Sequence, residues 1–382
     1  MALASKAEVR GLQPRDHEAA GALFTRVRES EMPRHYGDPT EEYDAAIRSV
    51  AVRDRSHRSR LLVRGSAPVE TLTGVFTGQM PSALEPLDGA GMKGVAQYSA
   101  VLTAKGKMVA DLRIMRGPES EDDSLFLDIP GSATKSLVKH LGRCVPPRLA
   151  TIDNVSNETG LLAVLGPEGA PAISEFVRDR HVSIDSLMGL GEGEFLVSGT
   201  GVDQVRVVKT LEVNTPAWDL FVSDKQATVL WRKLIHHGAK PIGVSVWDVL
   251  RVEAGRPAYG QDMDDSTILS ETGIVDRAVD HNKGCYTGQE VIVRIRDRGH
   301  VNRSLRGLLL ADGPIPKSNA ELFYDGRAAG HITSVVESPR SGGGIALGYV
   351  RKEVLMGERV AVASPDGPTA EVRNLSSNWA LS

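Results

Sequence analysis

The sequence predicts an α+β fold in which two related lobes, each a sheet with helices, are followed by an antiparallel β-barrel. Two observations carry this prediction. The stretches LLVRGSAPVETL (61–72) and LLAVLGPEGAPAISEF (161–176) share the order strand, glycine, proline, helix, which indicates an internal repeat. Beyond Val301 the chain changes to short alternating strands. At 382 residues it also exceeds the usual size of one core, so two or three domains are expected.

The N-terminal part, residues 1–42, is predicted to be a helical extension. Apolar residues recur there every four positions after Asp16, as they do on one face of a helix; they are Ala19, Leu23 and Val27. A second helix around Tyr43–Val50 and a strand at Leu61–Val63 then open the first lobe.

The two lobes are predicted to occupy residues 43–300. The strands VAQYSAVL and KMVADLRI follow the first copy of the repeat, and FLVSG, VRVV and DLFV follow the second. Each set of strands, with the helix of its own copy, makes one lobe. After them, SVWDVLRVEAGRP is predicted to be a helix. Ser245 and Asp248 fit a capping box at its start, and Gly255 and Pro257 supply a stop.

The C-terminal region, residues 301–382, is predicted to form a small antiparallel barrel. Its short strands are LRGLLLA, AELFY, AAGHITSVV, IALGYV, RVAVAS and TAEVRNL. Asp325-Gly326 has the composition of a hairpin turn, and Asp366-Gly367 marks another turn. A length of about 80 residues is usual for such a domain.

Composition excludes several classes of protein. The net charge of −4 gives no bulk attraction to nucleic acid or to a membrane, and no apolar run approaches the length of a membrane span or a signal peptide. The two cysteines, Cys144 and Cys285, match no metal spacing and are too few to hold an iron–sulfur cluster alone. No metal site is predicted, and a reduced protein of the cytoplasm is expected.

Two further motifs carry little weight. GAGMKG (89–94) matches G-x-G-x-x-G, but it follows no strand and precedes a strand, whereas a dinucleotide site needs strand, turn and helix together. His236-His237 ends a predicted helix and is expected to be a cap or a surface pair.

The stretch DHNKGCYTGQEV (280–291) is the strongest candidate for chemistry. Gly284 and Gly288 flank Cys285 and allow unusual backbone angles there. Lys283, two positions earlier, is expected to favour the reactive thiolate. From these residues alone Cys285 is a nucleophile, a metal ligand or a buried residue in a turn.

The next segment, EVIVRIRDRGHVNR, alternates apolar and basic residues and is predicted to be a strand with one basic face. That face is either an anion-binding surface or a strand edge protected by charge. Its arginines are Arg294, Arg296 and Arg298.

KGCYTGQE (283–290) resembles the signature of the YgfZ-type folate-binding proteins, which assist iron–sulfur cluster assembly or repair. These proteins are relatives of the aminomethyltransferase, the T-protein of glycine cleavage. Further resemblance covers nearly the whole chain from about Tyr43, in YDAAIRSVAVRDRSH, YSAVLTAKGKMVADLRI, LWRKLIHHGAKPIG, LRVEAGRPAYGQDM, RGHVNRSLRGL, GHITSVVESP and IALGYVRKE.

The resemblance implies three lobes around a central channel that admits tetrahydrofolate. Asp111 matches the channel aspartate of the aminomethyltransferases, and a carboxylate can accept two adjacent N–H groups of a pterin. Arg251 and Tyr259 match residues of the folate site, for the glutamate tail and the ring respectively. Each also has a structural alternative: Asp111 facing solvent, Arg251 paired with a nearby carboxylate, and Tyr259 in the core.

One departure concerns the turn GYTGE of the aminomethyltransferases. This chain has EVNTPAWDLFV, with Thr215 at the position of the pterin-binding glutamate, so Asp219 is the candidate to compensate. The aminomethyltransferases also generally lack the cysteine signature, so both features favour the YgfZ-type group.

The resemblance implies a tetrahydrofolate-binding accessory protein for maturation or repair of iron–sulfur enzymes, with Cys285 as functional thiol and Lys283 tuning it. Its partners would be a folate and iron–sulfur client enzymes or assembly factors. The alternative is a folate-dependent one-carbon transferase that moves a methyl or aminomethyl group. A nucleic-acid- or protein-binding module that uses the basic segment, including Arg303, ranks last because no aromatic residues interleave it.

Overall fold

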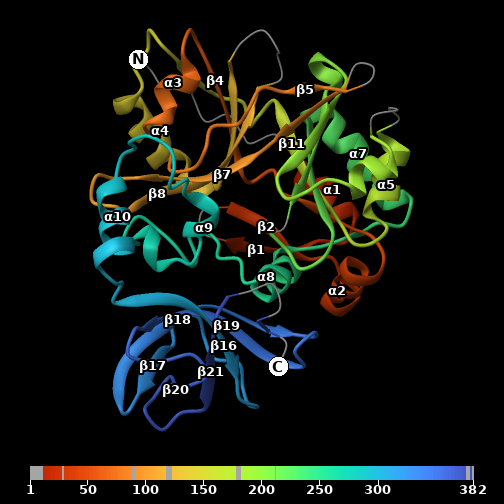
Figure 1. Ribbon diagram of the computed structural model, residues 1–382. Coiled ribbons are helices and arrows are strands. Elements are labelled where there is room, and N and C mark those ends of the chain that lie inside the picture. Colours follow the sequence, from red (N-terminus) through yellow and green to blue (C-terminus); the bar gives the residue numbers. More distant parts are fainter. Residues whose placement is uncertain are drawn as a thin grey trace.

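The computed structural model describes residues 12–27, 30–87, 91–117, 123–177, 182–210, 212–375 and 379–380. Its main parts are a five-stranded sheet, an eight-stranded sheet and a closed six-stranded barrel. Figure 1 shows the sheets above the barrel, with helix α8 (Val244–Glu253) near the junction between them. The predicted α+β fold, with two sheet-and-helix lobes and a C-terminal antiparallel barrel, is confirmed.

The first lobe is built on the five-stranded sheet. In spatial order its strands are β10 (Thr151–Asn154), β4 (Ser59–Arg64), β9 (Leu125–Ile129), β8 (Met108–Arg116) and β7 (Gln97–Leu102). One face packs under helices α3 (Pro68–Thr73) and α4 (Thr134–Cys144), in a buried cluster that contains Leu112 and Ile114 of β8. Because side chains alternate along a strand, Asp111 and Arg113 project from the opposite face, toward the second lobe.

The second lobe is built on the eight-stranded sheet. In spatial order its strands are β15 (Lys240–Pro241), β3 (Ala51–Asp54), β11 (Thr159–Leu165), β14 (Ala217–Ser223), β13 (Val205–Thr210), β12 (Glu194–Ser198), β6 (Met92–Val95) and β5 (Glu85–Pro86). Helices α5 (Gly169–Phe176), α6 (Ile184–Met188) and α7 (Asp224–His236) cover its outer face. The chain order of strand, glycine, proline and helix recurs in β4–α3 and β11–α5, so the repeat seen in the sequence corresponds to matching units.

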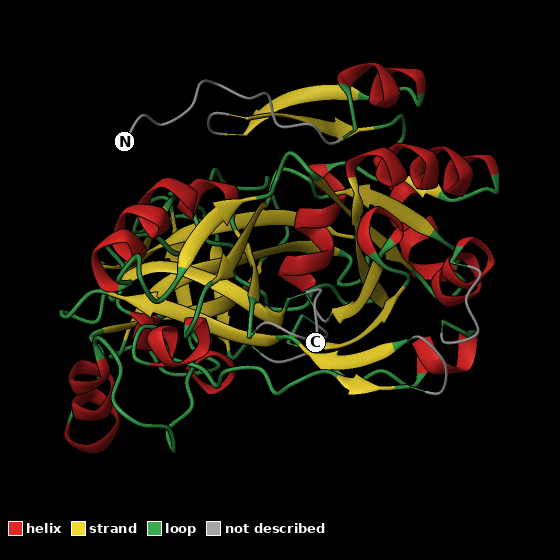
Figure 2. Cartoon of the chain, turned by 90° about the horizontal axis from the view of Figure 1, so that it is seen from above, coloured by secondary structure: helices red, strands yellow, loops and turns green. Residues whose placement is uncertain are grey.

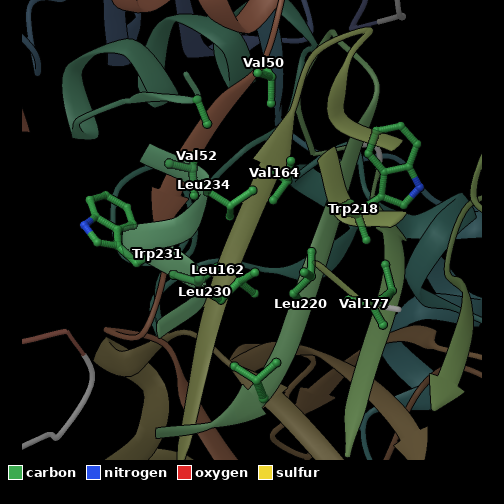
Figure 3. Packing of buried hydrophobic residues seen from close by; sticks show 14 of the residues in the cluster. Val50, Val52, Leu162, Val164, Val177, Trp218, Leu220, Leu230, Trp231 and Leu234 are labelled. Atoms are coloured by element: carbon green, nitrogen blue, oxygen red, sulfur yellow. The ribbon is translucent and has the colours of Figure 1, made fainter. Parts of the chain in front are cut away.

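Alternation sets the two faces of this second sheet. Figure 3 shows Val52, Val164 and Trp218 of three neighbouring strands in one cluster with Leu230, Trp231 and Leu234 of α7. Arg53, Ala163 and Asp219 are the chain neighbours of these three residues. They are paired in register across the three strands, and their side chains project from the opposite face of the sheet. Sequence alternation therefore places an arginine and an aspartate on the inner face.

The two sheets pack face to face. Met115 and Phe126 of the first sheet share a buried cluster with Phe195 and Phe221 of the second, and the rings of Phe126 and Phe221 meet edge to face at 5.4 Å. Arg113 crosses between the sheets to Asp219, with an N–O distance of 2.6 Å. The inner layer is thus apolar in one part and ionic in another.

The barrel follows the lobes in the chain. Its strands close in the order β16 (Arg303–Leu310), β19 (Gly343–Arg351), β18 (Arg327–Ser338), β17 (Glu321–Tyr324), β20 (Arg359–Val362) and β21 (Thr369–Arg373). Asp325 and Gly326 both have positive φ, of 49° and 72°, as the predicted two-residue hairpin turn requires. Helix α8 holds the barrel against the lobes: Trp379 donates from Nε1 to the carbonyl of Val252 at 3.0 Å.

The N-terminal segment differs from its prediction. A short helix α1 (Pro14–Ala19) is followed by a hairpin of β1 (Leu23–Val27) and β2 (Ser30–His35), so the predicted helix through Leu23 and Val27 is wrong. Gly21, with φ of +86°, ends the helix, and the β-branched and aromatic residues that follow favour a strand. Figure 2 shows this hairpin along the outside of the main body. The second predicted helix is present as α2 (Pro39–Arg48), and residues 1–11 lie outside the described part.

Two predictions near the end of the second lobe also change. The basic segment is not a strand but helix α10 (Gln289–Arg298), which follows the short helix α9 (Val275–Ala278). Helix α8 begins after Gly243, so Ser245 lies inside the helix rather than at its N-cap, and the predicted capping box is wrong. Asp248 pairs with Arg251. Its predicted stop is confirmed by Gly255, which has φ of +65°. Of GAGMKG, Gly89 and Ala90 lie outside the described residues.

Candidate functional site

A cavity of about 610 Å³ lies between the inner faces of the two sheets, helix α8 and the segment 256–261. This volume falls in the range of small-molecule sites. Among the described residues that line it, nine are arginine or lysine and four are aspartate or glutamate. The cavity is therefore suited to a ligand that carries negative charge.

Asp111, on β8, brings an unpaired carboxylate oxygen to this cavity. Its Oδ2 accepts a hydrogen bond of 2.7 Å from the hydroxyl of Tyr98, while its Oδ1 is buried and has no partner among the described residues. Burial raises the pKa of Asp111, and the positive charge of Arg58 opposes that rise. A buried acceptor without a donor is unfavourable, so Oδ1 is well placed to receive a donor from a ligand.

Beside Asp111, an ionic network joins the two sheets. Arg113 contacts Asp128 and Asp219 at 2.6 Å each, and Arg55 contacts Asp219 at 2.7 Å. Both aspartates are fully buried. Asp219 is thus occupied by two arginines and is not among the residues that line the cavity. Its ligand-binding role stays a prediction, and its observed contacts are structural.

Arg251, on α8, lines the cavity but is extensively paired. Its guanidinium contacts Asp248 at 2.7 Å and Asp262 at 2.9 Å, and donates to the hydroxyl of Ser334 in the barrel at 2.8 Å. These carboxylates outweigh the effect of burial and raise the pKa of Arg251. The structural alternative, pairing with a nearby carboxylate, therefore holds for Arg251, and its predicted contact with a ligand is untested.

Tyr259 also lines the cavity, partly buried against the core of the first lobe. Its hydroxyl donates to the carbonyl of Val109 at 2.8 Å, which fixes the ring two residues from Asp111 along β8. A ring held in this way can pack against a flat ligand.

The turn before β14 differs from the sequence interpretation. The hydroxyl of Thr215 donates to the carbonyl of Ala46 at 2.8 Å, and Thr215 is not among the residues that line the cavity. The acidic residue that this turn gives to the cavity is Glu212, whose carboxylate pairs with Arg55. Burial would raise the pKa of Glu212, but Arg55 and Arg113 outweigh it and lower the pKa to about 2. Glu212 is therefore ionised at neutral pH.

Sequence reasoning missed three cavity residues on and beside β3. Arg53 is 4% exposed, and in the part of the chain that the structure describes its Nη1 has no hydrogen-bond partner. Its Cζ lies 4.6 Å from the ring centroid of Trp247, and the Cζ of Arg55 lies 4.5 Å from the same centroid. Burial and three nearby arginines lower the pKa of His57 well below its usual value, so its imidazole is neutral at pH 7. The available signal was VRDRSHR, which places several cations in and after an otherwise buried strand.

Cys285 lies outside this cavity, in the loop between α9 and α10. Its side chain is exposed, so the interpretation as a buried turn residue is wrong. The ammonium of Lys283 donates to the carbonyls of Phe76 and Gly78, at 2.8 Å and 2.7 Å, and burial lowers its pKa. Within the described part of the chain no group of three or more His, Cys, Asp or Glu residues could hold a metal ion.

These features define a protein with an arginine-rich small-molecule cavity between two sheets, and a barrel attached through one helix. Residues 14–283 match the GCVT N-terminal domain, and residues 303–376 match the glycine cleavage T-protein C-terminal barrel domain. Since the first match spans more than half of the chain, the protein belongs to the glycine cleavage T-protein family. The predicted superfamily is thereby confirmed.

Individual relatives agree with the family assignment. The chain is 28% identical to an aminomethyltransferase of Rubrobacter xylanophilus over 91% of its own length and 88% of the relative. It is likewise 28% identical to one from Thermosynechococcus vestitus over 91% and 89%. The crystal structure of glycine cleavage system aminomethyltransferase T from Bartonella henselae superposes on this chain with a TM-score of 0.81 and 20% sequence identity. The match covers 95% of this chain and 97% of that chain, and it shows that the two share a fold. Among the described residues, no helix has the length and apolar character that a membrane crossing requires.

Proposed function

We propose that this protein binds tetrahydrofolate in the cavity and serves as a YgfZ-type accessory factor for the maturation or repair of iron–sulfur enzymes. The carrying observation is the buried, unpaired Oδ1 of Asp111 in the cavity wall. A pterin presents an N–H and an amino group side by side, and a carboxylate accepts such a pair well. Tyr259, held on Val109, supplies a ring surface beside it.

Ligand titration tests this core of the proposal. Tetrahydrofolate is titrated into the wild type and into Asp111→Asn, which keeps the shape of the side chain but removes its charge. We expect roughly 10-fold weaker binding by the variant, because a hydrogen bond to a charged group is lost. Asp153→Asn, which changes an exposed carboxylate, is the matched control and should bind like the wild type. Absence of binding by the wild type would contradict the proposal.

The accessory role rests on Cys285 and its place in the motif KGCYTGQE. An exposed thiol outside the cavity is accessible to another macromolecule, whereas a ligand enclosed in the cavity does not meet it. We propose that Cys285 acts as a transient thiolate toward a client or assembly factor in the cytoplasm. Lys283 holds its loop on Phe76 and Gly78.

Complementation of a deletion strain tests this role. Cys285→Ala should lower the activity of iron–sulfur enzymes in the cells and leave the folding and folate affinity of the protein unchanged. Cys144→Ala is the matched control, because Cys144 is the other free and exposed cysteine. Full complementation by Cys285→Ala would exclude the proposed role of the thiol.

A second candidate is a folate-dependent one-carbon transferase, which the names of the curated relatives favour. In that case the protein would transfer a methyl or aminomethyl group to tetrahydrofolate, and Cys285 would be dispensable. Turnover of a methyl or aminomethyl donor that requires tetrahydrofolate, and that survives Cys285→Ala, would favour this candidate over the accessory role.

The division of the chain is also part of the proposal. Residues 43–300 would carry the folate site, residues 301–382 would form the barrel domain, and residues 1–42 would be an N-terminal extension, whose described part is helix α1, the hairpin of β1 and β2, and the start of α2. The contacts of Arg251 with Ser334 support a site that depends on the barrel for its shape.

A further inference from the structure

Arg53 differs from most of the arginines that line the cavity. Arg55, Arg58, Arg113, Arg251 and Arg277 each pair with a carboxylate. Arg53 is as buried as Arg55 and Arg251, yet within the described part of the chain it forms no ion pair, and its Nη1 has no hydrogen bond. A buried cation without an anion is unfavourable, and here the open side is the cavity.

The setting of Arg53 prepares its guanidinium for a planar anion. Its Cζ lies over the ring of Trp247, 4.6 Å from the ring centroid, and its Nη1 has no hydrogen-bond partner among the described residues. The edge of a guanidinium matches a carboxylate through two parallel hydrogen bonds. Burial, with Arg55 nearby, lowers the pKa of Arg53 to about 9, so it stays mostly charged at pH 7.

Arg53 and Asp111 line the same cavity from different sheets. Arg53 lies in one row with Ala163 and Asp219 across the eight-stranded sheet. Asp219 pairs with Arg113, which follows Asp111 by two residues on β8 and shares its face. The cavity thus offers an unpaired acceptor on one sheet and an unpaired cation on the other, which suits a ligand with N–H donors at one end and an anion at the other.

The geometry points to Arg53 as the residue that binds a carboxylate of the glutamate tail of the folate. This inference rests on the proposed function, and it assigns to Arg53 the contact that the sequence had suggested for Arg251. Arg251 already has Asp248 and Asp262 as partners, so a ligand carboxylate would have to compete with both. Among the described residues, Arg53 forms no ion pair that a ligand carboxylate would have to displace.

Two ligands separate this contact from the pterin contact. Tetrahydrofolate carries the glutamate, whereas 6-methyltetrahydropterin has the reduced pterin ring and no carboxylate. Each is titrated calorimetrically into the wild type, Arg53→Gln, Arg53→Lys and the control Arg64→Gln, which changes a half-exposed arginine paired with Asp153. We expect Arg53→Gln to bind tetrahydrofolate roughly 10- to 100-fold more weakly, since a charge-assisted pair is lost. Its affinity for 6-methyltetrahydropterin should remain within about twofold, and Arg64→Gln should match the wild type for both ligands.

The possible outcomes are distinguishable. Selective weakening of tetrahydrofolate, partly restored in Arg53→Lys, supports the inference, because lysine keeps the charge without the planar fork. Unchanged tetrahydrofolate affinity in Arg53→Gln overturns it, and so does equal weakening of both ligands, which would assign Arg53 a structural role. If the wild type binds neither ligand, the proposed function itself fails. Arg53→Gln removes a buried unpaired charge, so we expect it to fold, and its thermal unfolding checks this.

Discussion

Lys283 and Cys285 lie two residues apart in the same loop and have different environments. The lysine is half-buried and donates to two backbone carbonyls, those of Phe76 and Gly78, while the cysteine side chain is exposed. Lys283 is therefore first of all an anchor of the loop. Tyr286, one position after Cys285, is buried in an apolar cluster and so anchors the loop on the other side of the cysteine.

The first prediction follows from this difference. Lys283→Met should lower the free energy of unfolding by about 1–3 kcal/mol, because two charged hydrogen bonds are lost and methionine keeps only the apolar stem. Cys285→Ala should change it by less than about 0.5 kcal/mol, since the side chain is exposed. Urea unfolding of both variants checks the pair. Equal stability of Lys283→Met and the wild type would show that the hydrogen bonds of Lys283 to Phe76 and Gly78 do not contribute to the free energy of unfolding.

At the residue scale, sequence reasoning found side chains but not their partners. Asp111 and Tyr259 were placed in the cavity by resemblance, and both line it. Arg251 was assigned a ligand by resemblance, with pairing to a nearby carboxylate as the alternative; its contacts with Asp262 in a loop and Ser334 in the barrel depend on the folded chain. Arg53 was not predicted as a site residue. The sequence VRDR (52–55) does not indicate which of its charged residues forms an ion pair with the opposite sheet.

At the scale of elements, helix α10 is the informative error. Val291, Val293 and Ile295 alternate as in a strand, but Ile292 and Ile295 also fit one face of a helix, and only Ile292 is fully buried. The packing of a short segment decides between the two patterns. Gly288 is the N-cap residue of the helix, and its backbone is in the left-handed region, with φ of 84°.

Gly288 gives the second prediction. A Cβ at this position would lie 2.7 Å from the carbonyl oxygen of Thr103, and the positive φ is unfavourable for any side chain. Gly288→Ala should therefore lower the free energy of unfolding by about 1–3 kcal/mol and loosen the Cys285 loop. Gly284→Ala is the matched control, because a methyl group there would have no other atom within 4 Å and the φ of Gly284 is not positive. Thermal unfolding and limited proteolysis compare the two, and an unaffected Gly288→Ala would show that the loop adapts.

At the scale of the whole molecule, the division into two sheet lobes and a barrel was predictable because each part repeats a simple pattern. The joining of the lobes was not. It depends on Arg113, which reaches from β8 to Asp219 on β14 and to Asp128 on β9. Arg58 also pairs with Asp128, at 2.7 Å. Charged residues are usually exposed, so the sequence gives no sign that these arginines and aspartates are buried. They come together only when the two sheets pack.

The third prediction concerns acid stability and this network. Burial would raise the pKa of Asp128, but Arg58 and Arg113 outweigh it and hold the pKa below its usual range. Glu212 behaves in the same way, with a pKa lowered to about 2. A carboxylate whose pKa is depressed on folding contributes stability above its unfolded pKa of about 4 and loses it as pH falls through the folded value. The free energy of unfolding should accordingly fall from about pH 5 toward pH 2.

Asp128→Asn isolates the contribution of one carboxylate to that profile. At pH 7 the variant should be about 3 kcal/mol less stable, because Arg58 and Arg113 lose their shared buried anion. Since this difference comes from the ionised form of Asp128, it should shrink as the pH falls, and urea unfolding at a series of pH values measures it. Asp153→Asn, in the exposed pair with Arg64, should follow the wild type throughout. A constant difference between Asp128→Asn and the wild type from pH 7 to pH 3 would mean that Asp128 acts through its shape and hydrogen bonds rather than through its charge.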